Sequence, residues 1–274
     1  MSWYAITRQE LSLSGTDSGK GPPVLFQHGL GGDDAQVAEF FPKLPNVRRL
    51  TLECRGQGRS HLGPVKDVSI AIFAADIAAF VEQQGVGRYV AGGVSMGAAI
   101  ALRLAVVAPQ NVRALILSRP AWLWDSAPAN MQPFAEVAGL LARLGPDAAL
   151  SKFDGSSTAR RLARDAPDNL ASLRGFFARP DPEATANLLA AIASDGPGVT
   201  LAQIRRLSVP TLVIGNGLDA IHPFAYAETL ANEIPDARMV RVTPKSQDRV
   251  RHAEEVRSAI AGFLGSLDTD GDQS

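Results

Sequence analysis

The sequence predicts an α/β protein in which a mostly parallel sheet is flanked by helices. The 274 residues are 46% hydrophobic and 20% charged, which supplies enough apolar side chains for a large core. Short apolar runs alternate with segments whose apolar residues recur every three or four positions. Strands that are apolar throughout are typical of parallel sheets, because helices cover both faces of such a sheet.

Six apolar runs are the predicted parallel strands, and they span residues 24–27, 49–53, 89–93, 114–117, 211–214 and 239–242. Before them, residues 3–6 and 10–13 predict an antiparallel hairpin at the edge of the sheet. Apolar positions at three-and-four spacing within residues 70–81 and 256–267 predict two helices. Each of these helices is expected to bury one apolar stripe on the sheet.

Between residues 119 and 200 the strand pattern stops, and four helical segments follow at 129–144, 158–165, 169–177 and 182–194. They are either ordinary crossover helices or an inserted cap. We favour the cap, because about eighty residues exceed what one crossover needs. The expected division is a core of residues 1–118 and 201–267, a helical cap of residues 119–200 and a disordered polar tail of residues 268–274.

The composition narrows the classes of partner. The formal net charge is −1, and the sequence has no long block of Lys or Arg. Neither nucleic acid nor a membrane is therefore expected as a partner, and we expect the protein to bind a small molecule. The single cysteine, Cys54, excludes an intramolecular disulfide, and no signal-peptide pattern or membrane-spanning run stands out. We expect a cytoplasmic protein, and its use of Ala and Arg is typical of bacteria. No cofactor and no metal site is expected, and the oligomeric state is left open.

The most informative motif is a serine within G-x-S-x-G, between a predicted strand and a predicted helix. Residues 93–97 read GVSMG. A very tight strand-turn-helix connection would hold the Ser95 hydroxyl clear of the sheet, and the flanking glycines leave room for that turn. The alternative is a glycine-rich turn with an incidental serine.

Four segments, in sequence order, resemble those of α/β-hydrolase-fold proteins that carry a helical cap. They are residues 27–32 (QHGLGG), residues 53–60 (ECRGQGRS, with Glu53 where the family has Asp), the serine motif, and residues 215–223 (GNGLDAIHP). The resemblance covers essentially the full chain. It implies a mostly parallel eight-stranded sheet with an inserted cap, and a serine hydrolase that needs no cofactor.

Asp219 is the predicted acid of a catalytic triad, because it follows a strand whose carboxyl end faces the region where reactive groups collect in such sheets. Its alternative role is to form a local turn. By resemblance, the backbone amides of Leu30 and Met96 form the oxyanion hole, and Met96 begins a helix whose dipole favours negative charge. His28 is expected to be a structural loop residue.

The general base is where the sequence departs from the family, whose last strand usually ends in Gly-His. Here residues 242–248 read VTPKSQD. We expect His252 to be the base, brought over the sheet edge by a longer loop, although it is also placed to pair with a neighbouring glutamate on a helix surface. His222, three residues after Asp219, is the second choice and otherwise lines the pocket. The third possibility is that no histidine acts as base.

The predicted activity is hydrolysis of a small ester, lactone or related carbonyl compound through an acyl-enzyme. Hydrolysis of a carbon-carbon bond or a thioester uses the same triad and stays open. If no base is present, a catalytically weak ligand-binding protein is the alternative, and a lyase or cofactor-free oxygenase is a third class. Trp122 and Trp124, with His222 and several phenylalanines, are predicted to line the substrate pocket or else to pack the cap against the core.

Overall fold

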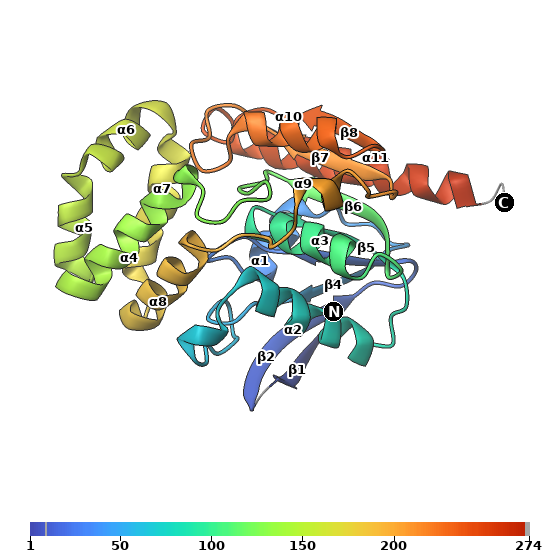
Figure 1. Cartoon of the computed structure of the whole chain (residues 1–274), viewed down its shortest axis with the longest axis horizontal. Helices are drawn as coiled ribbons and strands as arrows, with labels where there is room; N and C mark the ends of the chain where they lie inside the picture. Colours follow the sequence, from blue (N-terminus) through green and yellow to red (C-terminus); the bar gives the residue numbers. More distant parts are fainter. Residues whose placement is uncertain (9, 272–274) are drawn as a thin grey trace.

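An eight-stranded sheet organises the part of the chain that the computed structural model describes, residues 1–8 and 10–271 (Figure 1). The strand order across the sheet is β1-β2-β4-β3-β5-β6-β7-β8. The strands are β1 (Ser2–Arg8), β2 (Leu11–Ser18), β3 (Pro23–Gln27), β4 (Arg48–Leu52), β5 (Tyr89–Val94), β6 (Val112–Ser118), β7 (Thr211–Gly215) and β8 (Ala237–Arg241). The six predicted parallel strands are confirmed, and so is the mostly parallel, eight-stranded fold class.

The first two strands form the predicted antiparallel hairpin, in which Trp3 pairs with Thr16. β2 then pairs antiparallel with β4, whereas every pair from β4 to β8 is parallel. The inner strands β5 and β7 are buried along their whole length, which explains why they are apolar runs without polar alternation.

Helices cover both faces of the sheet. α2 (Ile70–Gln83), α3 (Met96–Val107) and α10 (Phe224–Glu233) contribute to one hydrophobic cluster, and α1 (Asp34–Phe40) and α11 (Arg249–Gly271) contribute to the other. The predicted helices at residues 70–81 and 256–267 lie within α2 and α11. α11 extends to Gly271, into the segment 268–274 for which a disordered tail is predicted; residues 272–274 lie outside the described residues, and the disordered tail stays a prediction.

A group of helices between β6 and β7 lies together at one end of the molecule (Figure 1). We call these the cap helices: α4 (Gln132–Leu144), α5 (Pro146–Asp154), α6 (Ser157–Asp165), α7 (Pro167–Gly175) and α8 (Pro182–Ala193). The four predicted helical segments correspond to α4, α6, α7 and α8, and α5 was not predicted. The short helix α9 (Leu201–Ile204) leads back to β7. The division into core and cap at residues 119 and 200 stays a prediction.

The ends of the inner strands lie at one edge of the sheet. The parallel register pairs Gln27 with Gly93, Val94 with Ser118, and Ser118 with Ile214. The segments that follow β3, β5, β6 and β7 therefore begin side by side. Apart from Val94, the last residue of β5, every residue of the candidate site described below that lies outside the cap helices comes after one of the parallel strands.

Candidate active site

Ser95 occupies the turn between β5 and α3 in a conformation that side chains rarely adopt, with φ 58° and ψ −112°. Two glycines make this turn possible. A Cβ atom on Gly97 would lie 2.3 Å from the Gln27 carbonyl oxygen, and one on Gly93 would lie 2.6 Å from the Gly97 carbonyl carbon. The close approach of β3, β5 and α3 thus excludes any side chain at these positions, and the serine is raised above the end of the sheet.

The hydroxyl of Ser95 is hydrogen-bonded to a histidine that is itself bonded to an aspartate. His222 Nε2 lies 2.8 Å from Ser95 Oγ, and His222 Nδ1 lies 2.9 Å from Asp219 Oδ1. The side chains of both residues are largely buried, with 11% of His222 and 3% of Asp219 exposed. The chain Ser95–His222–Asp219 has the geometry of a nucleophile, a base and an orienting acid.

The histidine and the aspartate come from one loop after β7 because the aspartate itself folds that loop. Asp219 Oδ1 accepts hydrogen bonds from the backbone amides of Ile221 at 3.2 Å and His222 at 3.0 Å. This side-chain turn brings the His222 ring back onto the carboxylate that forms the turn. Asn169 of α7 braces the loop, since its Oδ1 accepts from the amides of Ala220 and Ile221. The local-turn role and the triad geometry of Asp219 thus occur together.

His252, the histidine expected beside Ser95, is bonded elsewhere. Its Nδ1 donates to the Thr243 carbonyl oxygen at 2.8 Å, and its ring packs edge-on against Phe40, with 5.7 Å between ring centroids. Its Nε2 is buried and has no hydrogen-bond partner among the described residues. The structure thus places His252 away from Ser95 Oγ, because α11 begins at Arg249 and turns the His252 side chain inward against Phe40 of α1.

Arg119, which the sequence reasoning missed, holds the other side of Asp219. It follows β6 with φ 48°, and its Nη2 and Nε donate to Asp219 Oδ2 at 2.6 and 3.1 Å. The same Nη2 lies 3.2 Å from His222 Nδ1. The sequence did contain a signal for this contact. β6 and β7 are neighbours in the sheet, and Arg119, which is buried after β6, needs an acidic partner such as Asp219, which follows β7.

The charges around this cluster set its protonation. Burial alone would raise the pKa of Asp219, but His222 and Arg119 outweigh burial and hold that pKa well below its ordinary value. Burial lowers the pKa of His222 below its ordinary 6.5; Asp219 opposes this effect, whereas Arg119 and Lys245 add to it. At neutral pH the aspartate is therefore ionised and the histidine is neutral. Because Asp219 is an acceptor, it selects the form in which Nδ1 carries the proton and Nε2 is free to accept.

The amides of Leu30 and Met96 lie on the two segments that meet at Ser95. Among the described residues neither amide donates a hydrogen bond, and Met96 is the first residue of α3. The Leu30 loop is fixed on both sides. The Gly29 amide donates to Gln36 Oε1 and the Gly31 amide to Gln57 Oε1, each at 2.7 Å.

His28 is structural, as expected. Its Nδ1 donates to the Gly29 carbonyl at 2.8 Å, and its Nε2 accepts from the Cys54 amide at 3.0 Å. Burial lowers the pKa of His28, so the ring stays neutral. It ties the loop after β3 to the segment after β4.

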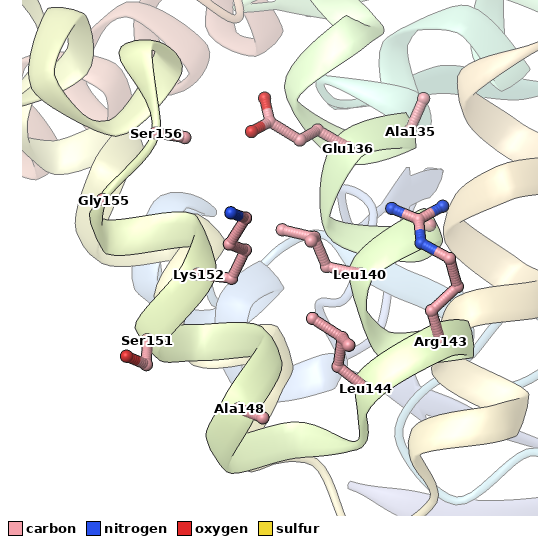
Figure 2. A pocket seen from close by; sticks show the side chains of 11 residues that line it. Ala135, Glu136, Leu140, Arg143, Leu144, Ala148, Ser151, Lys152, Gly155 and Ser156 are labelled. Atoms are coloured by element: carbon pink, nitrogen blue, oxygen red, sulfur yellow. The ribbon is translucent and has the colours of Figure 1, made fainter.

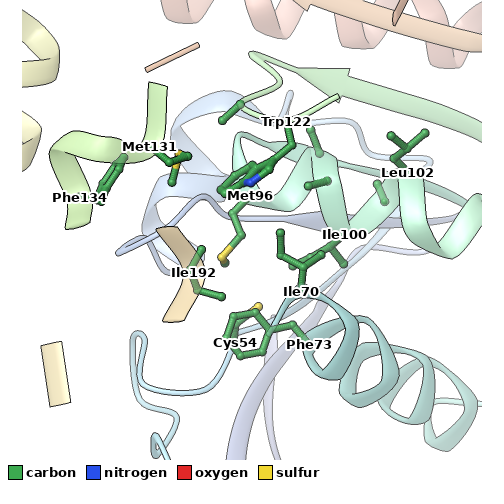
Figure 3. Close-up of a cluster of buried hydrophobic side chains, with 14 of the residues drawn as sticks. Cys54, Ile70, Phe73, Met96, Ile100, Leu102, Trp122, Met131, Phe134 and Ile192 are labelled. Atoms are coloured by element: carbon green, nitrogen blue, oxygen red, sulfur yellow. The ribbon is translucent and has the colours of Figure 1, made fainter. Parts of the chain in front are cut away.

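A small cavity of about 90 Å³ opens at Ser95 and His222. Its apolar lining comes from Leu30, Val94, Phe134, Leu173, Phe176 and Ile221, and its polar lining from Gln36, Arg119, Asn169, Ser172 and Lys245. The expected tryptophans are not among these described lining residues. Trp122 is 1% exposed within the main hydrophobic cluster, where Figure 3 shows it among Met96, Met131 and Ile192, and Trp124 packs against the same cluster. Two of the phenylalanines, Phe134 and Phe176, line the cavity in their place.

A larger hollow on the described surface lies elsewhere. It is an open groove of about 780 Å³ between α4 and α5, lined by Glu136, Leu140, Arg143 and Lys152 among others (Figure 2). Its described lining comes from the cap helices and the turn after α5, away from Ser95.

The family model of the alpha/beta hydrolase fold matches residues 22–246. This span includes every strand from β3 to β8 and all of the cap helices. The chain belongs to the alpha/beta hydrolase fold family. It is therefore an α/β-hydrolase enzyme by family.

Relatives of this α/β-hydrolase include RutD of Pseudomonas savastanoi pv. phaseolicola, named as a candidate carbamate hydrolase, at 28% identity over 80% of this chain and 84% of that protein. A thermophilic esterase from Thermogutta terrifontis has a similar structure, with TM-score 0.73 and 25% identity over 97% of this chain and 99% of its own. The enol-lactonase from Burkholderia xenovorans shares the fold, with TM-score 0.69 and 22% identity over 97% and 98% of the two chains.

The loop after β8, where the family usually has its histidine, carries a lysine in this α/β-hydrolase. Lys245 lines the cavity at Ser95, and its Nζ lies 3.3 Å from Asp168 Oδ2. The histidine bonded to Ser95 thus comes from the loop after β7, and the loop after β8 contributes a cation.

Neither a metal-binding cluster nor a membrane-spanning helix occurs in the described part of the chain. Within residues 1–8 and 10–271, no group of three or more His, Cys, Asp or Glu side chains is placed to hold a metal ion. Over the same residues, no helix combines the length and the apolar character that a membrane crossing requires.

Proposed function

We propose that this α/β-hydrolase is a serine hydrolase of small esters, lactones or related carbonyl compounds, with Ser95 as nucleophile, His222 as general base and Asp219 as orienting acid. The observation that carries the proposal is the position of His222, whose ring bonds Ser95 Oγ at 2.8 Å and Asp219 Oδ1 at 2.9 Å. His222 thus takes the role that the sequence reasoning gave to His252.

In the proposed reaction, Ser95 Oγ attacks the carbonyl carbon while its proton passes to His222 Nε2. The imidazolium that forms is stabilised by Asp219, which accepts the hydrogen bond of the Nδ1 proton throughout. His222 then gives the proton to the leaving oxygen, and the acyl group remains on Ser95. A water molecule, activated by the same Nε2, opens the acyl-enzyme and restores the serine.

The negative charge that develops on the carbonyl oxygen is assigned to the amides of Leu30 and Met96. Neither N–H has an acceptor among the described residues, and Met96 adds the positive end of the α3 dipole. Because the Leu30 loop is held by Gln36 and Gln57, its amide is positioned before the substrate arrives. Donors fixed in advance stabilise the transition state without reorganising during the reaction.

The names of the relatives agree with acyl-group hydrolysis. RutD is named for hydrolysis of a carbamate, and the two solved relatives are named as an esterase and an enol-lactonase. Carbamates, esters and lactones all contain a carbonyl group that a nucleophile can attack. The alternative of a weak ligand-binding protein was motivated by the missing Gly-His after the last strand; the bond between His222 and Ser95 favours the hydrolase over it.

The proposal is tested by comparing turnover of p-nitrophenyl acetate and butyrate by the wild type, Ser95→Ala, His222→Ala and His252→Asn. We expect Ser95→Ala and His222→Ala to lower kcat by about 10⁴- to 10⁶-fold, since triad members act as a unit. His252→Asn keeps a donor for the Thr243 carbonyl and is expected to retain turnover close to that of the wild type.

The same proteins report on the nucleophile directly. A fluorophosphonate probe is expected to label the wild type and His252→Asn at Ser95, and Ser95→Ala is the blank. Loss of turnover in His252→Asn with full activity in His222→Ala would reject the proposed base. A folded wild type that neither turns over the esters nor takes the label would reject the hydrolase itself.

A further inference from the structure

The charged side chains that line the cavity at Ser95 are of one sign. Among the described lining residues these side chains are Arg119 and Lys245, and both are cationic. Their carboxylate partners, Asp219 and Asp168, are not part of the described lining. A substrate in this cavity therefore meets positive charge and apolar surface, and no negative charge from these residues.

Arg119 and Lys245 differ in how many of their hydrogen-bond donors have a partner among the described residues. Arg119 directs Nη2 and Nε to Asp219 Oδ2, and the same Nη2 lies against the His222 ring. Arg119 therefore helps to hold His222 and its partner Asp219 in place.

Lys245 is only partly used. Its ammonium has three donors, and its ion pair with Asp168 Oδ2, at 3.3 Å, is its one polar contact within the described residues. That distance is long for a charge-assisted hydrogen bond, whose usual length is about 2.7–2.9 Å. The side chain is also 15% exposed, so it is shielded from bulk water but reachable from the cavity.

The positive charge of Lys245 is close enough to Ser95 and His222 to act on them electrostatically. Its charge is one of the causes that lower the pKa of His222, together with burial and Arg119. The lysine thus stands on the same small cavity as the nucleophile, within the reach of a short acyl chain bound to Ser95.

We propose that Lys245 is an anion-binding residue of the substrate pocket, and that the substrate is a short-chain carbonyl compound whose acyl group carries a carboxylate. This inference rests on the proposed serine hydrolase function. The carboxylate would take the free donors of the Lys245 ammonium while the carbonyl group lies at Ser95. The apolar lining from Leu30, Phe134 and Phe176 would cover the methylene groups between them.

The size of the cavity limits the chain between the two groups. About 90 Å³ admits a few methylene groups and excludes a long fatty-acyl chain. A lysine, as a compact point charge, holds a carboxylate without demanding the two-pronged geometry that an arginine requires. The proposed acyl group is therefore a short dicarboxylate half-ester or a lactone of comparable size.

Two esters of equal chain length test the proposal. p-Nitrophenyl hemisuccinate carries a carboxylate where p-nitrophenyl butyrate carries a methyl group. We expect Lys245→Gln to lower the ratio of kcat/KM for hemisuccinate to kcat/KM for butyrate by about tenfold or more, because a charge-assisted hydrogen bond is lost. Lys245→Arg keeps the charge and is expected to restore most of the ratio. Lys152→Gln removes a cation from the α4–α5 groove instead and is expected to leave both rates unchanged (Figure 2).

A ratio that Lys245→Gln leaves unchanged would overturn the anion site, and an equal loss on both esters would assign Lys245 to the support of the loop. These outcomes differ from failure of the hydrolase, in which neither ester shows Ser95-dependent turnover. In that case the anion site is tested by measuring the binding of two esters to an inactive variant. Ser95→Ala is expected to bind monomethyl succinate more tightly than methyl butyrate in a calorimetric titration, and Ser95→Ala/Lys245→Gln is expected to lose that preference. Equal binding of the two esters by Ser95→Ala would also overturn the anion site.

Discussion

At the scale of single residues, Arg119 poses the sharpest question, because its guanidinium contacts both members of the Asp219–His222 pair. It neutralises the carboxylate through Oδ2, and it places a positive charge 3.2 Å from His222 Nδ1. The first contact keeps the aspartate ionised in a buried place. The second opposes protonation of the histidine. Arg119 thus holds the carboxylate of the proposed acid in place and lowers the pKa of the proposed base at the same time.

The pH dependence of the reaction follows from these charges. His222 must be neutral to act as base, and its pKa lies below 6.5 because of burial, Arg119 and Lys245, with Asp219 opposing them. We therefore expect kcat/KM to fall on the acid side with an apparent pKa below 6.5 and to be flat at neutral pH. A fall with a midpoint clearly above 6.5 would contradict this assignment.

Arg119→Met tests the origin of that shift. Removing the positive charge raises the pKa of His222, so the acid limb of kcat/KM is expected to move to higher pH, and Arg119→Lys is expected to move it less. A purely structural arginine would lower the whole profile without moving the limb. Because Asp219 loses a buried partner, the free energy of unfolding of Arg119→Met is also expected to fall, by about 3–5 kcal/mol.

The individual residues also show what the sequence could predict of the site. That Ser95, Asp219, Leu30 and Met96 lie close together is predictable, because each follows a predicted strand in a recognisable motif and the parallel strands end at one sheet edge. Which histidine lies beside Ser95 was not predictable, because spacing along the chain says nothing of a side-chain turn. The amide bonds that Asp219 accepts decide where the His222 ring points. The direction of the His222 ring could be predicted only by considering the turn that Asp219 forms with these amides.

At the scale of elements, the close approach of β3, β5 and α3 at the serine turn is what positions Ser95, the proposed nucleophile. Gly97 sits at the contact, where a Cβ would lie 2.3 Å from one backbone oxygen and 2.8 Å from the next. Both neighbours are main chain, so neither can rotate away. The glycines of G-x-S-x-G are therefore a packing requirement of three elements.

Gly97→Ala is expected to push α3 away from β3, and with it the Ser95 hydroxyl and the Met96 amide. We expect a loss of about 1–3 kcal/mol in the free energy of unfolding, as for other overpacked sites, and a fall in kcat that exceeds any rise in KM. Gly262→Ala in α11 is the matched control, because no described atom outside the helix's own backbone lies within 4 Å of the place that its Cβ would take. It is expected to stabilise the protein by up to about 1 kcal/mol. Wild-type turnover in Gly97→Ala would contradict this role of the glycine.

The elements also differ in how well the sequence predicts them. The buried strands are predictable because nothing but apolar residues satisfies a sheet covered on both faces. α5 was missed because it begins with Pro146 directly after Gly145, a pair that is typical of a turn. The glycine has φ 73° and ends α4, and the proline starts the next helix at the position where its missing N–H does no harm. Only Ala149 and Phe153 of α5 are buried, so its apolar pattern is weak.

At the scale of the whole molecule, the cap helices and the core share one hydrophobic cluster. Trp122, Met131 and Ile192 pack in the same cluster as Met96 and Ile70 (Figure 3). Since the cavity at Ser95 takes its lining from the cap helices as well as the strand ends, the site exists only when both are folded together. No helical periodicity predicts which cap side chains reach the cavity, and this is why Phe134 and Phe176 could not be chosen over Trp122 and Trp124.

The return of the chain from the cap to the core is fixed by Asp195. Its carboxylate accepts from the Ile70 amide at 2.6 Å, at the start of α2, and its carbonyl oxygen accepts from Trp122 Nε1 at 2.9 Å. The carboxylate thus joins the end of the cap segment to a core helix 125 residues away in the chain. A negative charge at the start of a helix is also favoured by the helix dipole.

We expect the cap and the core to unfold in one transition, because the buried residues of the cap helices belong to the same hydrophobic cluster as one face of the sheet and form no cluster of their own among the described residues. Urea unfolding followed by far-UV circular dichroism and by tryptophan fluorescence, which reports on Trp3 in β1 and on Trp122 and Trp124 near the junction, is expected to give coincident curves. Asp195→Ala removes the bond to Ile70 and is expected to shift both curves together by about 1–3 kcal/mol. Asp181→Ala, which removes an N-cap within the cap at α8, is the matched control and is expected to shift both curves by about 1 kcal/mol. Two separate transitions, with only one moved by Asp181→Ala, would show that the cap folds independently of the sheet that carries Ser95.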